Sequence, residues 1–307
     1  MMEIYFKDIK SQTLQKLDQI KSGSWINIEN ATVEDLNFVK EITNLNYSDL
    51  EDVLDVHELP RIERKEDAVI LFVRDAQFVN KDKDISTTPL TIITTSKYII
   101  TISISRIQTI RFLINNGFDF STTQRSKFLI NVLLNISKNY TKGVKNINNS
   151  IEYQKDKLER ITNADILKLI ENEEILSDYI AALDPMKIVF ETIEKGKYIP
   201  LYSYDEDLIE DMIISMRQSV GICSTNLKSI KSLRESYQII FTNNLNRTIK
   251  LLTSVTVFLT IPTMVASFFG MNVLIPFSEG SLTFVCIVLM SLLFSGAFFI
   301  FFINKKY

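Results

Sequence analysis

LLTSVTVFLTIPTMVASFFGMNVLIP, residues 251–276, contains no charged side chain. Its first part, 251–269, is close to the roughly 20 apolar residues that a helix needs to span a bilayer. A second and more apolar run covers 282–303, and the short segment 270–281 separates the two runs. Such a connection predicts a helical hairpin with both ends on one side of a membrane. The alternative is a pair of core helices in a soluble protein, and two adjacent uncharged runs of this length argue against it.

The basic residues near the two runs predict their orientation. Arg247 and Lys250 precede the first run, and the tail 304–307 carries two lysines, whereas the loop 270–281 has neither Lys nor Arg. Loops on the cytoplasmic side of a membrane carry an excess of Lys and Arg. We therefore expect a multi-pass protein of the plasma or inner membrane, embedded in a lipid bilayer, with both termini in the cytoplasm.

A polar stripe runs along the first apolar run. Its members recur at seven-residue spacing, which keeps them on one side of a helix. They are Asn246, Thr253, Thr260 and Ser267 in one row, and Ile249, Thr256, Thr263 and Gly270 in a second row. Hydroxyl groups on a membrane helix face protein or water. The stripe therefore predicts either packing between helices or a water-lined path formed by several copies around an axis.

The segments before the apolar runs predict an α/β domain followed by long helices. In residues 1–120, β-branched residues predict strands at 24–31, 68–76, 89–96 and 98–105, and Thr32 begins a predicted helix at 32–43. Residues 121–202 have the charge pattern of antiparallel helices, in which Pro185 is expected to bend or end one helix. The whole chain is thus expected to join a cytosolic α/β domain to a helical region and a membrane hairpin.

A single long helix is expected to begin at Ser203. From there the chain has no proline until Pro262, so 203–250 is predicted to form a stalk that continues into the first span. A helix of about 65 residues would be roughly 100 Å long at 1.5 Å per residue. Movement at the far end of such a helix can therefore reach the membrane.

Composition excludes several classes of function. The net charge of −3 and the pI near 5.5 argue against a nucleic-acid partner. His57 is the only histidine, and the sequence has no cysteine–histidine cluster, phosphate-binding loop or catalytic triad, so we expect no enzyme. Cys223 and Cys286 fall in different kinds of segment, which predicts free thiols.

Gly270-Met271-Asn272, at the end of the first of two C-terminal apolar runs, resembles the signature of the CorA family of divalent-cation channels. The stretch LEDVLDVHELPRIERKEDAVILFV, residues 50–73, also looks like a region of that family. The resemblance implies a funnel-shaped homopentamer in which the first spans line a pore and the second spans form an outer ring. Phe269 departs from the family pattern, in which a tyrosine is usual. The following loop also differs, and Glu279 is the acid that stands there.

The resemblance assigns roles to particular residues. It implies a selectivity filter of Gly270, Met271 and Asn272, pore-lining residues Asn246, Thr256, Thr260, Thr263 and Ser267, and a hydrophobic gate of Ile249 and Leu252. It also implies a regulatory Mg²⁺ site with Glu51, Asp52 and Asp211 between neighbouring subunits, and Glu279 as the loop acid. A ring of neutral asparagine amides accepts hydrogen bonds from the water shell of Mg²⁺, which that ion gives up reluctantly, and still releases the ion.

The expected function is therefore a Mg²⁺ channel that opens when cytosolic Mg²⁺ is low. Met271 favours Mg²⁺ over Zn²⁺ by the same resemblance. Two alternatives remain open at this point. One is a transporter of Co²⁺, Ni²⁺ or Zn²⁺ from the same family, and the other is a membrane-anchored coiled-coil scaffold or sensor that conducts no ions.

Overall fold

The computed structural model describes the chain except residues 12, 78–86, 117–119, 158–160, 272–280 and 305–307, and the side chains of residues 203, 281, 283 and 302–304. The chain divides into two compact units, Met1–Leu233 and Arg234–Tyr307. One helix, α5 (Ser203–Phe269), contributes residues to both units.

The first unit is built on a seven-stranded sheet in the order β2-β1-β3-β7-β6-β5-β4. Neighbouring strands are antiparallel, except that β3 and β7 run parallel. The strands are β1 (Met2–Phe6), β2 (Gln15–Leu17), β3 (Trp25–Glu29), β4 (Arg61–Lys65), β5 (Ala68–Ala76), β6 (Thr87–Thr94) and β7 (Ile99–Ser103).

The four strands predicted from the sequence are confirmed as β3, β5, β6 and β7. The sequence did not predict β1, β2 and β4, which lie toward the two edges of the sheet. Strand β4 reads RIERK, so four of its five side chains are charged. Charged side chains on an edge strand discourage pairing with another chain, and they also remove the hydrophobic pattern by which a strand is recognised.

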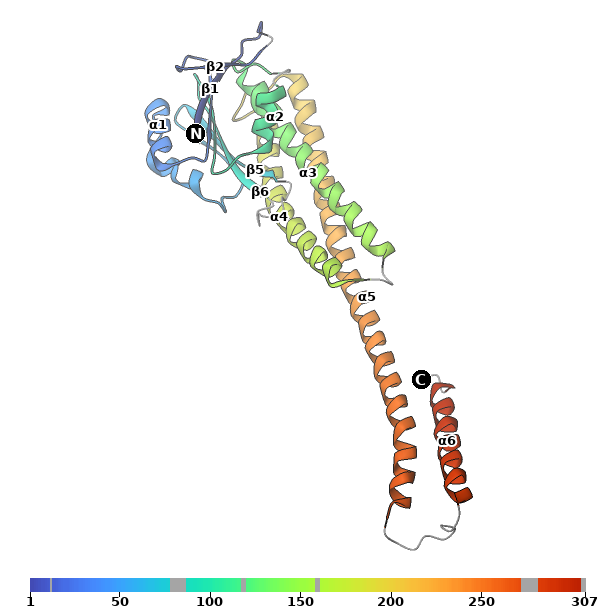
Figure 1. Ribbon diagram of the computed structural model, residues 1–307. Helices are drawn as coiled ribbons and strands as arrows, with labels where there is room; N and C mark the ends of the chain where they lie inside the picture. The colour runs from blue at the N-terminus through green and yellow to red at the C-terminus, as the bar shows by residue number, and fades with distance from the viewer. Residues whose placement is uncertain (12, 78–86, 117–119, 158–160, 272–280, 305–307) are drawn as a thin grey trace. The chain divides into compact units, whose positions relative to one another are not determined.

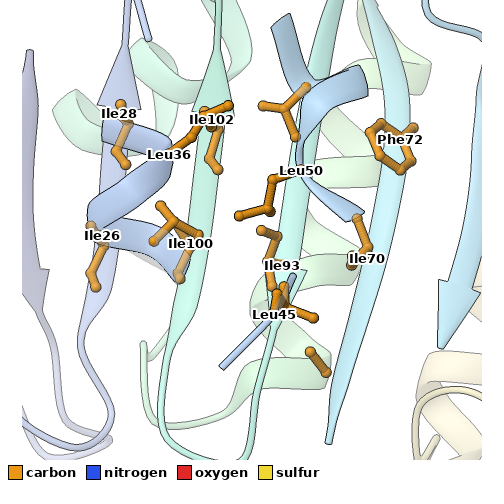
Figure 2. Packing of buried hydrophobic residues seen from close by; sticks show 13 residues of the cluster. Ile26, Ile28, Leu36, Leu45, Leu50, Ile70, Phe72, Ile93, Ile100 and Ile102 are labelled. Atoms are coloured by element: carbon orange, nitrogen blue, oxygen red, sulfur yellow. The ribbon is translucent and has the colours of Figure 1, made fainter. Parts of the chain in front are cut away.

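One face of the sheet is covered by α1 (Val33–Thr43) and the short 3-10 helices η1 (Tyr47–Asp49) and η2 (Glu51–Leu54). The predicted start of α1 is confirmed, because the Thr32 hydroxyl accepts a bond from the Asp35 amide and the Asp35 carboxylate accepts one from the Thr32 amide. The core beneath these helices is buried and aliphatic. Figure 2 shows Ile26, Ile28, Ile100 and Ile102 from β3 and β7 against Leu36, with Leu45, Leu50, Ile70, Phe72 and Ile93 beside them.

The other face of the sheet is covered by α2 (Gln108–Asn116), α3 (Arg125–Asp156) and α4 (Asn163–Glu194) (Figure 1). Trp25 is fully buried on this face. Its ring lies 4.9 Å from that of Phe128 and 6.2 Å from that of Phe120, and its Nε1 donates to Thr101 Oγ1 at 2.8 Å. Helices on both faces explain why β5, β6 and β7 are buried along almost their whole length.

The antiparallel helices expected in residues 121–202 are confirmed as α3 and α4, which lie side by side in opposite directions (Figure 1). Pro185 does not end α4, which continues from it to Glu194. Gly143 of α3 is close to Tyr179 of α4, since a Cβ atom at Gly143 would lie 2.5 Å from the Tyr179 hydroxyl. This glycine allows the two helices to pack around that ring.

The second unit holds the membrane-facing part of α5 and all of α6 (Ser281–Asn304). Helix α5 has 67 residues, which confirms the expected long helix. Two apolar stretches, in Tyr204–Phe269 and Phe284–Phe301, are long enough to cross a membrane. Only 6% and 11% of the residues in their most hydrophobic parts are buried, whereas the core helices of a soluble protein are mostly buried.

Candidate ion pathway

Helix α6 packs against one face of α5. The ring of Phe258 in α5 lies 5.6 Å from that of Phe299 in α6, and Ser254 is 7% exposed on the same face. Below this contact the two helices line an apolar groove. The lining residues are Ile261, Val265 and Phe269 from α5, and Ile287, Met290, Ser291, Phe294 and Phe298 from α6.

Pro262 leaves one carbonyl group of α5 without its usual hydrogen bond within the helix. Proline has no amide proton, so Pro262 cannot donate to the carbonyl oxygen of Phe258 four residues earlier. Ser295 of α6 is fully buried, and its hydroxyl donates to that oxygen. In lipid, where no water is available, a backbone group freed by proline needs such a partner from a neighbouring helix.

The polar stripe lies on the opposite face of α5. Positions Thr256, Thr260 and Thr263 lie about 140–160° around the helix from Phe258, at about 100° per residue. The stripe residues Asn246, Ile249, Thr253, Thr256, Thr260, Thr263, Ser267 and Gly270 are all exposed. Among the described residues, the chain's own second apolar helix therefore does not pack on the stripe.

Three threonines of the stripe have their hydroxyl protons engaged. Thr256 Oγ1 donates to Leu252 O at 2.9 Å, Thr260 to Thr256 O at 2.8 Å, and Thr263 to Leu259 O at 2.8 Å. A hydroxyl oxygen whose proton is bound to its own helix keeps its lone pairs for outside donors. The stripe thus presents a row of acceptors, and the water shell of a cation consists of donors.

The structure reaches only the first two residues of the expected filter. The Gly270 amide donates to Ala266 O at 2.9 Å and the Met271 amide to Phe268 O at 3.4 Å, so both residues extend the last turn of α5. Met271 is exposed. Asn272 and Glu279 lie outside the described residues.

The residues expected to form the gate lie at the other end of the stripe. Ile249 and Leu252 are 51% and 65% exposed, although both are apolar. Asn246, one turn before Ile249, is exposed as well. Large apolar side chains with this exposure are available to contact other copies.

In the first unit, the expected regulatory residue Asp52 forms an ion pair with Arg61. Arg61 Nη2 lies 2.7 Å from Asp52 Oδ2, and Nε lies 2.6 Å from Glu63 Oε1. Nη1 binds Glu58 Oε1, and the guanidinium carbon lies 3.9 Å from the centre of the Phe72 ring. The sequence pattern alone assigns no role to Arg61. The only signal was the alternation of opposite charges in ELPRIERK, residues 58–65.

The other two expected regulatory residues do not join Asp52 in a preformed metal site. Glu51 is exposed beside Asp52 in η2, and Asp211 is exposed on α5. Within the part of the chain that the structure describes, no group of three or more His, Cys, Asp or Glu side chains is arranged to hold a metal ion. The described part of one chain therefore does not by itself provide a complete ligand set for such a site.

A buried carboxyl group, which no sequence pattern indicated, connects β5 to two helices. Asp75 is fully buried; its Oδ2 accepts from the Thr109 amide at 3.1 Å and its Oδ1 from Asn139 Nδ2 at 3.0 Å. Burial raises the pKa of Asp75 to about 6, although the hydrogen bonds from Asn139 and Thr109 lower it. Arg74, on the same strand, is turned toward other acceptors and donates to the carbonyls of Val56 and Glu58.

Comparison with known proteins decides the family. The family described as "CorA-like Mg²⁺ transporter protein" matches residues 21–306 of this chain. The chain belongs to the CorA family. It is therefore a metal-ion transporter of the membrane with two C-terminal transmembrane helices, and not an enzyme. The family resemblance found in the sequence is confirmed.

Individual CorA relatives agree with this assignment. The cobalt/magnesium transport protein CorA of Methanocaldococcus jannaschii is 24% identical over 275 residues, which cover 84% of this chain and 83% of that protein. The complete structure of the CorA magnesium transporter from the same organism has a TM-score of 0.78 at 21% identity, covering 100% of this chain and 98% of that one. The full-length CmaX protein has a TM-score of 0.73 at 14% identity, covering 98% and 97%. At these identities the solved structures establish the fold alone.

Proposed function

We propose that this CorA-family transporter is a Mg²⁺ channel that admits the ion down its electrochemical gradient. The observation that carries the proposal is the row of hydroxyl acceptors on the face of α5 opposite α6. A membrane helix that exposes such a row to lipid would be unfavourable, whereas a row that faces water inside an assembly is stable.

The path requires several copies of the chain, because one chain with two spans cannot enclose a pore. We propose a homopentamer in which α5 lines the axis and α6 lies outside it. The position of α6 on the far side of α5 supports this arrangement, since it leaves the stripe uncovered. The exposed gate residues Ile249 and Leu252 would then meet their counterparts and close the path by excluding water.

Mg²⁺ suits this path because it keeps its hydration shell. The ion requires octahedral oxygen coordination and loses water slowly. Asn272 amides at the outer mouth and threonine hydroxyls below would accept hydrogen bonds from that shell. A divalent ion gains about 4.6 kcal/mol per 100 mV of inside-negative potential, twice the value for a single charge, so transport needs no ATP.

We further propose that cytosolic Mg²⁺ holds the channel closed by binding between subunits at Asp52 and Asp211, with Glu51 nearby. Bound Mg²⁺ would neutralise carboxylates that repel each other when the ion leaves. Both termini would lie in the cytoplasm, which fits the basic residues beside the spans.

Co²⁺ is a second candidate cargo, because the curated relative is called a cobalt/magnesium transport protein. Hard oxygen ligands alone accept both ions. Met271 and Asn272 are neutral, and neither holds a divalent ion as tightly as a carboxylate would.

Flux measurements in proteoliposomes test the proposal. The full-length protein should carry Mg²⁺ inward under an inside-negative potential, and Co²⁺, Ni²⁺ and Zn²⁺ added in competition should rank the cargoes. Asn272→Ala should abolish Mg²⁺ uptake while the oligomer stays intact. Wild-type flux no greater than that of empty liposomes would refute the channel.

A further inference from the structure

We infer that Arg61 is a built-in competitor of divalent cations for the carboxylate of Asp52, and that it thereby sets the Mg²⁺ concentration at which the channel closes. The inference rests on the proposed regulatory role of Asp52. The juxtaposition that carries it is the Arg61 guanidinium bound to Asp52, Glu58 and Glu63 at once.

The guanidinium of Arg61 is held in place from several sides. Its three nitrogens each bind a different carboxylate, and one face of its plane lies 3.9 Å from the Phe72 ring centre. Arg61 and Phe72 are register partners in the β4–β5 pair, so the backbone fixes this stacking. A planar guanidinium with such contacts loses little freedom by staying bound.

The ionic group around Arg61 carries more negative than positive charge. Lys65 Nζ lies 3.1 Å from Asp49 Oδ1 and 3.6 Å from Glu63 Oε2. Four carboxylates thus surround two cations, which leaves a net charge of −2. This excess attracts divalent ions to the region, although both resident cations already occupy carboxylate oxygens.

Asp52 is the most exposed carboxylate of the group, and therefore the one most accessible to an external ion. Its side chain is 49% exposed, compared with 12% for Glu58 and 32% for Glu63. Arg61 binds Oδ2, while Oδ1 has no hydrogen-bond partner among the residues that the structure describes.

Asp52 therefore fits Mg²⁺ only in part. Its oxygens are the hard ligands that the ion prefers. To bind, however, Mg²⁺ must either take Oδ2 from Arg61 or use Oδ1 against the repulsion of a positive charge on the same carboxylate. Either route weakens the binding of Mg²⁺, so Arg61 raises the concentration needed for closure.

The matched pair Arg61→Gln and Arg64→Gln tests the inference. Both substitutions remove one positive charge from β4, but Arg64 contacts the carbonyl of Tyr198 and makes no ion pair within the described part of the chain. Protection of the full-length protein in detergent from chymotrypsin is measured against Mg²⁺ concentration at constant ionic strength. Chymotrypsin is suitable because none of the substitutions alters an aromatic cleavage site.

The midpoint of Mg²⁺ protection should fall on the order of tenfold in Arg61→Gln, because a single and a double charge about 6 Å apart interact by roughly 1.4 kcal/mol at the dielectric constant of water, which corresponds to a factor of ten. In Arg64→Gln it should change by less than about twofold, because more distant exposed charges are screened. Adding Asp52→Asn to Arg61→Gln should abolish this decrease in the midpoint. That result would show that Arg61 acts through Asp52.

Arg61→Gln leaves three carboxylates without their common partner and could therefore impair folding. Arg61→Lys is a second variant that keeps the positive charge. Lysine keeps the charge but cannot bind three carboxylates in one plane, so its midpoint should lie between those of wild type and Arg61→Gln. Equal midpoints in wild type and both folded Arg61 variants would overturn the inference and leave the channel proposal standing. If Mg²⁺ protects none of these proteins, both the competition and the regulatory site are wrong, and flux then shows whether the channel itself survives.

Discussion

Ser295 of α6 donates a hydrogen bond to the carbonyl oxygen of Phe258, which lies four residues before Pro262 in α5. The bond replaces the helical one that proline cannot make. It also fixes which face of α5 the second span covers, and so leaves the threonine stripe uncovered.

A double-mutant cycle on Ser295 and Pro262 should show strong coupling. Ser295→Ala leaves the Phe258 carbonyl without a partner in an apolar contact, which should cost about 1–2 kcal/mol of stability. In a Pro262→Ala background the new amide supplies the bond, so Ser295→Ala should cost much less. Thermal unfolding of all four proteins in detergent measures the difference, and additive effects would show that the two residues act independently.

The stripe should matter for flux while hydroxyls on the other face should not. Thr260→Val keeps the shape of the side chain but removes the acceptor, and we expect Mg²⁺ uptake to fall several-fold. Ser254→Ala removes a hydroxyl that also donates to its own helix, at Lys250 O, but that is buried on the α6 side. Equal flux in Thr260→Val and wild type would show that the stripe does not line the path.

A charge at the proposed gate should cause a leak. Leu252→Asp would hydrate the neck, so Mg²⁺ uptake should persist at internal Mg²⁺ concentrations that block the wild type. Leu251→Asp is the control, because it places the same charge about 100° around the helix. Unaltered block in Leu252→Asp would locate the gate elsewhere.

Asp75 should make stability depend on pH in the mildly acidic range. Its pKa rises from an ordinary value of 3.8 to about 6 in the folded protein, so the folded state holds the proton more tightly than the unfolded state. The contribution to stability is fully present below about pH 4 and is lost as pH rises through 6, at a total cost of about 3 kcal/mol.

Asp75→Asn removes this titration. The variant loses one acceptor, because an amide nitrogen must face either Asn139 or Thr109, and this cost should not vary with pH. The wild type should therefore lose stability relative to the variant between pH 4 and 7, as measured by thermal unfolding of the full-length proteins. A constant difference across that range would mean that Asp75 does not titrate there.

Much of the fold was predictable because it depends on local patterns. The absence of proline between Ser203 and Pro262 predicted α5, and the seven-residue spacing of its hydroxyls predicted one stripe. The spacing could not reveal which face α6 would cover, since this is set by contacts such as Ser295 with Phe258. Arg61 escaped prediction for a similar reason: it meets Asp52 only because β4 pairs with β5 beside η2.

The single tryptophan offers a native reporter for the first unit. Trp25 is fully buried between β7 and the rings of Phe120 and Phe128, and the sequence contains no other indole. Its fluorescence emission should shift to the red only when the sheet core opens to solvent. Intrinsic fluorescence thus follows unfolding of the sheet separately from events in α6, without any label, in the same sample in which ion flux is recorded.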